Sequence, residues 1–410
     1  MSLLRHAPPA RTARWRAATG AVATVALLAM ATAACGGRPG PALPALPTPS
    51  PPADADAPLS TSIETSAGSW AVVPMGRLGQ PLNTFWQLFF RPADGLSRWS
   101  DEASALAVAT NGGLVLATPD GRSLAVGIRP ANRLDFSPLV VTSDGGRSWS
   151  PAAPLPSLAK QPDALAVGPV GRALSLTTTA TGDEVLESRE GLASWHLLTT
   201  ANGLGSSPAG HACGLVSITA VGSTRAGSFI GAGCRRAGVV GIFSASRGGW
   251  RLVGPSLPSS LHRGGATVVG LRSTNDGLCA LVAVSDGHDT ILVAAWTANG
   301  GGTWRDGPAL KLGSGQLRSF GPDGETGLFV LSSGTAAPHA AEVISGPGAG
   351  WRALPALPIN TATLVFGPVG RVDALAVSDD VFADWVLRSE PASWTRAQVM
   401  NVPIEFGSSG

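Results

Sequence analysis

The sequence contains no tyrosine and carries little charge. Tyr is absent from all 410 residues, although there are 12 Trp and 11 Phe. An enzyme that needs a phenol as its nucleophile is therefore excluded. Asp, Glu, Lys and Arg make up 14% of the chain, and the formal net charge is +2. Because nucleic-acid-binding domains carry a basic stripe or patch, this balance argues against a nucleic-acid partner.

The motifs of common metal and nucleotide sites are also missing. The sequence has no G-x-S-x-G elbow, no P-loop and no dinucleotide fingerprint in a strand-to-helix context. The six histidines show no ligand spacing; they are His6, His196, His211, His262, His288 and His339. The stretch SDGHD (285–289) reads as a polar turn, with an ion site as the alternative. We therefore expect no metal and no cofactor.

Long helical periodicity is missing as well, except near the N-terminus. Short apolar runs separated by Gly, Asp and Ser turns predict strands instead, for example at 266–272, 278–285 and 290–296. The sequence therefore predicts an all-β fold.

The N-terminus has the pattern of a secretory signal. Four arginines precede an uncharged apolar run at 17–34, and Cys35 follows directly. The small residues before Cys35 resemble the lipobox of bacterial lipoproteins, which implies a lipidated Cys35 on the extracytoplasmic face of the cell membrane. The alternative is an uncleaved membrane anchor, because the run of 18 residues is near the lower limit for a span.

A proline-rich segment follows the signal. Residues 36–58 include eight prolines and no aromatic residue, so they cannot form a core and predict an extended tether. We expect a signal peptide at 1–34, a lipidated Cys35 with its tether at 35–58, and a globular domain at 59–410.

A tryptophan motif recurs along this domain. TSDGGRSW (142–149) is echoed by TANGGGTW (297–304) and by weaker copies, at intervals of 43 to 55 residues. The repeat tryptophans are Trp99, Trp149, Trp195, Trp250, Trp304, Trp351 and Trp394. A second echo is GPVGR, at 168–172 and 367–371. Such a period is typical of propellers and solenoids, and each period has room for four short strands.

The motif predicts a tight hairpin turn. Gly145 and Gly146 tolerate positive φ, Asp144 can accept hydrogen bonds from the turn, and Trp149 can pack between neighbouring sheets. The residues expected to hold the two clearest turns are Thr142, Asp144, Gly146, Ser148 and Trp149, and Thr297, Asn299, Gly301, Thr303 and Trp304.

These residues resemble the Asp box, or BNR repeat, of sialidases, sortilin-like receptors, some endoglucanases and a photosystem assembly factor. The resemblance implies a sialidase-like β-propeller in which the Asp box is a structural motif. We expect seven blades, closed by pairing of a C-terminal strand at 401–408 with N-terminal strands at 69–75 and 83–90. A six-bladed propeller is the alternative.

The cysteines suggest one disulfide. Cys213 and Cys234 are placed symmetrically about the turn-like GSTRAG (222–227), so they face each other across a hairpin and we expect a Cys213–Cys234 bond. Two buried free thiols are the alternative. Cys279 reads as a small buried hydrophobe.

Sialidase chemistry is not expected, because the resemblance implies a Tyr nucleophile that this chain lacks. Arg91 in FFRPADG and Arg129 in GIRPANR only approximate the family's arginine motif, and are either ligand residues or strand-end residues. We expect no catalytic residue, and a monomer that binds a glycan or an envelope protein. The alternatives are an envelope scaffold and a glycoside hydrolase that uses carboxylates, chosen from Asp101, Glu102, Asp163, Asp183, Glu184, Asp373, Asp379 and Asp380.

Overall fold

A computed structural model of the chain describes most of residues 61–404. The contacts divide the chain into Met1–Asp54 and Ala55–Gly410, and every described residue belongs to the second unit. The segments left out within the described part are 78–82, 95–97, 104–109, 111–112, 119–120, 129–138, 153–161, 169–170, 190–191, 263, 275–276, 287–288, 314, 334–339, 368–369 and 391. The signal segment, Cys35, the tether and Arg129 lie outside the described residues.

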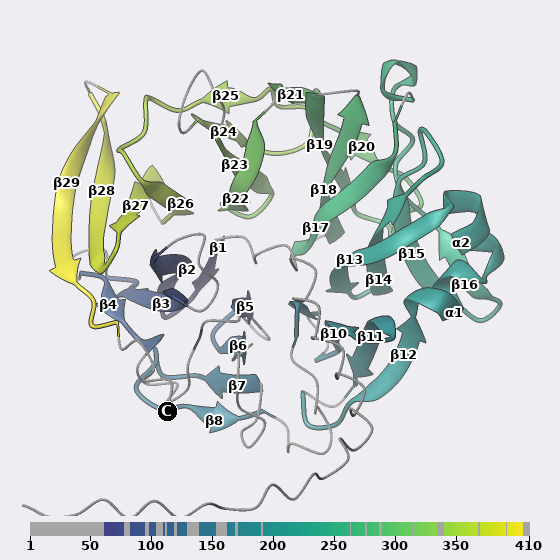
Figure 1. Ribbon diagram of the computed structural model, residues 1–410, viewed down its shortest axis with the longest axis horizontal. Helices are drawn as coiled ribbons and strands as arrows, with labels where there is room; N and C mark the ends of the chain where they lie inside the picture. Colours follow the sequence, from purple (N-terminus) through teal and green to yellow (C-terminus); the bar gives the residue numbers. More distant parts are fainter. Residues whose placement is uncertain are drawn as a thin grey trace, which may run out of the picture. The chain divides into compact units, whose positions relative to one another are not determined.

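The described strands form seven antiparallel units in chain order, six of four strands and one of five (Figure 1). Sheet 1 contains β1 (Thr61–Thr65), β2 (Gly68–Gly76), β3 (Thr84–Pro92) and β4 (Ser100–Asp101). Sheet 2 contains β5 (Leu114–Ala117), β6 (Leu124–Ile128), β7 (Leu139–Thr142) and β8 (Ser150–Pro151). Sheet 3 contains β9 (Ala164–Val167), β10 (Ala173–Thr179), β11 (Gly182–Ser188) and β12 (His196–Thr200).

The next two units are joined by pairing of β14 with β17, and β21 adds a further strand to the second of them. Sheet 4 contains β13 (Leu215–Thr224), β14 (Gly227–Cys234), β15 (Gly241–Ser246) and β16 (Gly249–Leu252). Sheet 5 contains β17 (Ala266–Thr274), β18 (Gly277–Asp286), β19 (Asp289–Thr297), β20 (Arg305–Asp306) and β21 (Leu310–Gly313). A short 3₁₀ helix, η4 (Ser259–Leu261), precedes β17.

Two further sheets complete the fold. Sheet 6 contains β22 (Gln316–Asp323), β23 (Gly327–Ser333), β24 (Ala340–Ile344) and β25 (Arg352–Ala353). Sheet 7 contains β26 (Thr361–Phe366), β27 (Val372–Ser378), β28 (Val381–Ser389) and β29 (Ala392–Asn401). The described part is thus an all-β propeller with seven blades, as the sequence predicts, and the six-bladed alternative is wrong.

The repeat tryptophans occupy one position in all seven sheets. Five directly precede the fourth strand of their sheet, and Trp250 and Trp394 lie on it. Each belongs to a different hydrophobic cluster between its own sheet and the sheet before it. The Nε1 of Trp304 donates to the carbonyl of Val253, at 2.6 Å, just beyond the fourth strand of sheet 4. The periodicity therefore marks the sheet-to-sheet contacts, because a large ring fills each of them.

The two clearest turns have matching hydrogen bonds. In the first, Asp144 accepts from the backbone N–H of Ser148 at 3.0 Å and from its hydroxyl at 2.6 Å. In the second, Asn299 Oδ1 accepts from the backbone N–H of Thr303 at 2.8 Å. Gly146 has φ 87° and donates its N–H to the hydroxyl of Thr142 at 3.0 Å. The hydrogen bonds from Ser148 lower the pKa of Asp144 to about 2.

The seventh sheet packs against the first, but neither sheet contributes a strand to the other. The predicted pairing of 401–408 with the N-terminal strands is wrong for the described residues, because Asn401 pairs with Val381 inside sheet 7. Residues 405–408 lie outside the described part. Strand β1 had no clear signal in the sequence, since Ile63 is its only apolar residue. It supplies the first strand of sheet 1, so that sheet needs no borrowed strand.

Side chains close this junction, which we call the seam between sheets 7 and 1. The Ser62 hydroxyl donates to the carbonyl of Leu364 at 3.0 Å. Gln398 accepts from the N–H of Trp99 and donates to its carbonyl, both at 2.9 Å, so the amide acts like a short piece of paired strand. The Phe89 and Phe382 rings stack with their centroids 4.2 Å apart. Backbone pairing across the seam is limited, in the described residues, to a bridge between Gly76 and Asp379.

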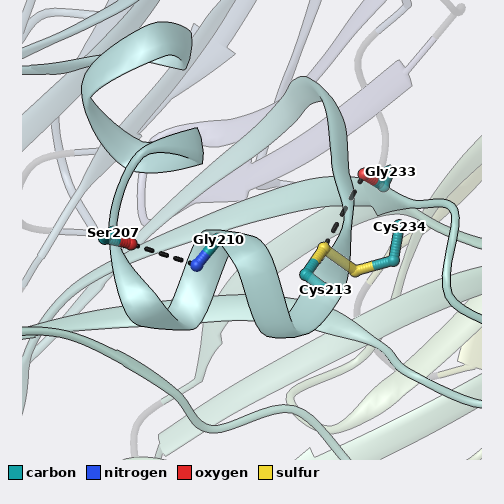
Figure 2. Close-up of a disulfide and its surroundings, with 5 residues drawn as sticks. All are labelled: Ser207, Gly210, Cys213, Gly233 and Cys234. Atoms are coloured by element: carbon teal, nitrogen blue, oxygen red, sulfur yellow. Dashed lines mark hydrogen bonds between the residues drawn. A yellow bond between two sulfur atoms is a disulfide. The ribbon is translucent and has the colours of Figure 1, made fainter.

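A helical insert lies between sheets 3 and 4. Helix α1 (Ala201–Gly205) is capped by Thr200, and α2 (Pro208–Cys213) is capped by Ser207, which accepts from the N–H of Gly210. None of the described helices has the length and the hydrophobicity of a membrane span. Cys213 at the end of α2 is bonded to Cys234 at the end of β14, with their Cα atoms 5.0 Å apart (Figure 2). The expected disulfide is confirmed, and Cys279 is free and buried as expected.

Removing this disulfide is expected to destabilise the domain. The bond closes a loop with a sequence separation of 21, and constraining a loop of this size in the unfolded chain contributes about 3 kcal/mol. A Cys213→Ala, Cys234→Ala variant should therefore unfold at a lower urea concentration than the wild type. Wild type treated with a phosphine reductant should match it, whereas an unchanged midpoint in both would contradict the expectation.

Candidate functional site

Among the described residues, a group of buried charges that includes Arg91 lies in the seam. The side chain of Arg91 is 2% exposed, and its Nη1 donates to Asp373 Oδ2 at 2.6 Å. Its Nη2 donates to the hydroxyl of Ser69 at 3.3 Å, and the guanidinium lies over the ring of Trp99, 4.8 Å from its centroid. The structure thus places Arg91 inside a sheet-to-sheet contact, away from solvent.

Strand register explains why these groups meet. Glu64 pairs with Ser69, and Ser69 pairs with Arg91, so the three residues form one row across sheet 1. Phe89 lies two residues before Arg91 on β3 and belongs to the seam cluster. Because side chains alternate along a strand, Arg91 faces sheet 7 as well. Asp373 faces sheet 1 for the same reason, since Leu375 on β27 belongs to that cluster.

Two more charged groups from sheet 7 complete the cluster. The Nε of Arg371 donates to Asp373 Oδ1 at 2.8 Å, and its Nη2 lies 3.5 Å from Asp384 Oδ2. Burial raises the pKa of Asp384 to about 7, and the adjacent Asp373 carboxylate adds to this rise, while Arg91 and Arg371 oppose it. The Asp384 side chain also hydrogen bonds to that of Asp373, which requires a proton on one of them.

Glu64 is the third carboxyl group of the seam. Burial raises the pKa of Glu64 to about 7, although a hydrogen bond with Ser69 and the charge of Arg91 lower it. Glu64 Oε1 and Asp384 Oδ1 are buried without a hydrogen-bond partner in the described residues. The seam therefore holds three carboxyl groups and two arginines, and its charge balance depends on the protonation of Glu64 and Asp384.

Each copy of the GPVGR segment supplies an arginine that lies beside a buried carboxylate. Arg371 lies beside Asp373 in the seam, and Arg172 lies beside Glu187. The segment connects the first and second strands of sheets 3 and 7, so that Arg172 and Arg371 occupy equivalent positions. The leading glycine makes room in both copies. A Cβ on Gly168 would lie 2.4 Å from the Ser223 hydroxyl of the next sheet, and one on Gly367 would lie 3.0 Å from Arg91 Nη2. The identical segments were the sequence signal for these arginines, whose role sequence reasoning missed.

Arg172 belongs to a second charged cluster, at the contact of sheets 3 and 4. Its centre is Glu187, whose side chain is 4% exposed. Glu187 Oε2 accepts from Arg189 Nε at 2.8 Å and lies 3.3 Å from His196 Nε2. Glu187 Oε1 accepts from the Ser228 hydroxyl at 2.8 Å and lies 3.7 Å from Arg172 Nε.

The environment keeps Glu187 ionised. Its burial acts to raise the pKa, but the hydrogen bonds from Ser228 and Arg189 and the charges of Arg189 and Arg172 outweigh this, so the pKa of Glu187 lies below its ordinary value. Unlike the seam, this cluster is open to solvent, because the side chains of Arg172, Arg189 and His196 are 34%, 68% and 50% exposed.

Several other carboxylates named from the sequence accept hydrogen bonds from backbone N–H groups or from a hydroxyl. Asp101 accepts from the N–H of Ala103 at 3.0 Å, and Asp183 accepts from the N–H of Ile218 at 2.9 Å. Asp163 accepts from the N–H of Thr178, and Glu102 accepts from the Ser100 hydroxyl. No group of three or more His, Cys, Asp or Glu side chains in the described residues is arranged to hold a metal ion.

Comparison with known proteins finds distant structural similarity and no family. No protein-family model and no curated protein matches the sequence. A putative 6-phosphogluconolactonase from Bacteroides uniformis is similar in structure at 10% identity, with a TM-score of 0.48, over 81% of this chain and 96% of that one. The periplasmic gluconolactonase of Pseudomonas aeruginosa is similar at 14% identity and a TM-score of 0.48, over 81% and 95%. YCF48 bound to the D1 peptide is similar at 12% identity and a TM-score of 0.40, over 80% and 90%.

Proposed function

We propose that the chain is a lipid-anchored β-propeller on the extracytoplasmic face of a bacterial membrane, where it binds a glycan or protein partner and catalyses no reaction. The N-terminal pattern ending in Cys35 supports the anchor. The Cys213–Cys234 disulfide supports an oxidising compartment, where such bonds persist. The proline-rich tether would hold the domain away from the membrane surface.

The burial of the seam carboxyl groups carries the non-catalytic part of the proposal. Asp373 and Asp384 are the acids with the most suggestive surroundings, since they adjoin each other and two arginines, and burial raises the pKa of Asp384 to about 7. A glycoside hydrolase needs two carboxyl groups that both reach the scissile bond. Because the side chains of Asp373 and Asp384 are 0% and 3% exposed, a sugar cannot reach either of them.

A panel of fluorogenic glycosides tests this proposal. The protein used is the compact unit Ala55–Gly410, which contains every described strand. We expect no turnover of sialosides, glucosides or galactosides above that of a heat-denatured sample. Turnover of any of these substrates above that background would establish the hydrolase alternative instead. A glycan array with the same protein reports binding independently of turnover.

Lipidation of Cys35 is tested in cells. Cells that express the full chain are grown with an alkyne fatty acid, and we expect the label to appear on the wild type and to be lost in a Cys35→Ala variant. A Cys279→Ala variant, which changes a buried thiol, is the matched control and should keep the label. Equal labelling of the wild type and Cys35→Ala would support an uncleaved anchor.

A further inference from the structure

The two charged clusters share one plan but have opposite charge balance. In each, the arginine of a GPVGR segment lies beside a buried carboxyl group at a sheet-to-sheet contact. The seam has three carboxyl groups for two arginines. Among the described residues, the cluster around Glu187 has one carboxylate for Arg172 and Arg189, so the charges of these three groups sum to +1, and His196 adds another when it is protonated.

Glu187 contacts both arginines but does not occupy all of their N–H donors. It meets each of them through Nε only, and no other described carboxylate pairs with either arginine. Among the described residues, no partner is found for the Nη groups of either guanidinium ion, so these groups are available to a ligand. These side chains are 34% and 68% exposed, so a ligand from solvent can reach them.

The hairpin of β13 and β14 leaves space beside Arg172 and adds positive charge there. The Nη1 of Arg172 would lie 3.9 Å from a Cβ on Gly227, which has φ 146° at the start of β14. The adjoining turn of this hairpin carries Arg225, which is exposed. Because two guanidinium groups present paired N–H donors, the preferred ligand is a group with two or more oxygens that share a negative charge.

We propose that Arg172 and Arg189, held in place by Glu187, form a binding site for an oxyanion, namely the carboxylate of an acidic sugar or a phosphate group. The proposal rests on the binding function proposed above and gives it a ligand chemistry and a place. The arginines lie where strands β10 and β11 meet the turns of sheet 3, at the end of the sheets that also carries the turns at 142–149 and 297–304.

Calorimetric titration of the unit Ala55–Gly410 at low ionic strength tests the site. The probes are sodium glucuronate and inorganic phosphate, with glucose as the neutral match for glucuronate. We expect at least one anion to bind and glucose not to bind. Arg189→Gln and Arg172→Gln should each weaken anion binding about tenfold, the loss expected for one charged hydrogen bond. Added NaCl should weaken it as well, because the arginines are exposed.

Arg247→Gln is the matched control. Arg247 is also exposed, in the equivalent outer turn of sheet 4, and has no ion pair with a described carboxylate, so its variant should bind anions as the wild type does. Glucuronate binding without phosphate binding would identify an acidic sugar, and the reverse would identify a phosphate ligand. If neither anion binds, or if all three arginine variants behave alike, the oxyanion site is wrong, while a positive glycan array would leave the proposed function standing. Turnover in the glycoside panel would contradict the non-catalytic function but would not contradict the oxyanion site.

Discussion

Replacing Arg91 by Met is expected to lower the free energy of unfolding by about 3–5 kcal/mol, the range found when one partner of a buried ion pair is removed. Met keeps much of the length of the side chain, so the loss reports on charge more than on volume. Asp373, with a side chain 0% exposed, would keep Arg371 as its one cationic partner among the described residues, and the Ser69 hydroxyl would keep only its hydrogen bond with Glu64. Urea unfolding followed by Trp fluorescence measures the change at pH 7.5.

Arg388→Met provides the control for this experiment. Arg388 lies on β28 of the same sheet pair but is exposed, so its replacement is expected to change stability by less than about 0.5 kcal/mol. A loss in Arg91→Met no larger than that in Arg388→Met would mean that the ion pair does not hold the seam. Because the seam joins the first and last sheets, its opening also exposes the aromatic contact between Phe89 and Phe382 to solvent.

The repeating part of the fold is readable from the sequence because the same packing problem recurs in every blade. A Trp ring fills each sheet-to-sheet contact, so a Trp recurs in the sequence every 43 to 55 residues. The turn before it needs Gly and Asp, and these residues recur with the Trp in the clearest copies. The strands predicted at 266–272, 278–285 and 290–296 correspond to β17, β18 and β19, each one or two residues longer at its ends.

The contacts of the seam could not be predicted from the sequence, because they occur once and leave no repeated pattern. Arg91 and Asp373 are 282 residues apart, and only closure of the propeller brings them together. Nothing near either residue indicates its partner. The sequence singled out Arg91 as a ligand candidate from FFRPADG, whereas the neighbouring register of Glu64 and Ser69 turns it inward. The open cluster around Glu187 was missed for a related reason, since Ser228 reaches it from the next sheet, 41 residues further along the chain.

The same seam is expected to make the domain less stable at pH 8 than at pH 5, by about 3–4 kcal/mol. Glu64 and Asp384 both have pKa values raised to about 7 in the folded state, from 4.5 and 3.8. Between these values the folded chain binds more protons than the unfolded chain, so stability falls as the pH rises. Each unit of pKa is worth about 1.4 kcal/mol, and the partial exposure of Glu64 reduces its share.

Two variants separate this effect from general alkaline destabilisation. Asp384→Asn and Glu64→Gln each remove one raised pKa, so each should flatten the dependence on pH, and the double variant should remove most of it. Asp380→Asn, at an exposed turn of the same sheet, should keep the wild-type slope. A wild type that is equally stable at pH 5 and pH 8 would show that Glu64 and Asp384 titrate alike when folded and unfolded. At pH 8 the seam holds three carboxylates against two arginines, and burial of Glu64 and Asp384 makes their ionisation costly. Glu187 differs from them, because its hydrogen bonds and arginine neighbours hold its pKa below the ordinary value, so it stays ionised over the same range.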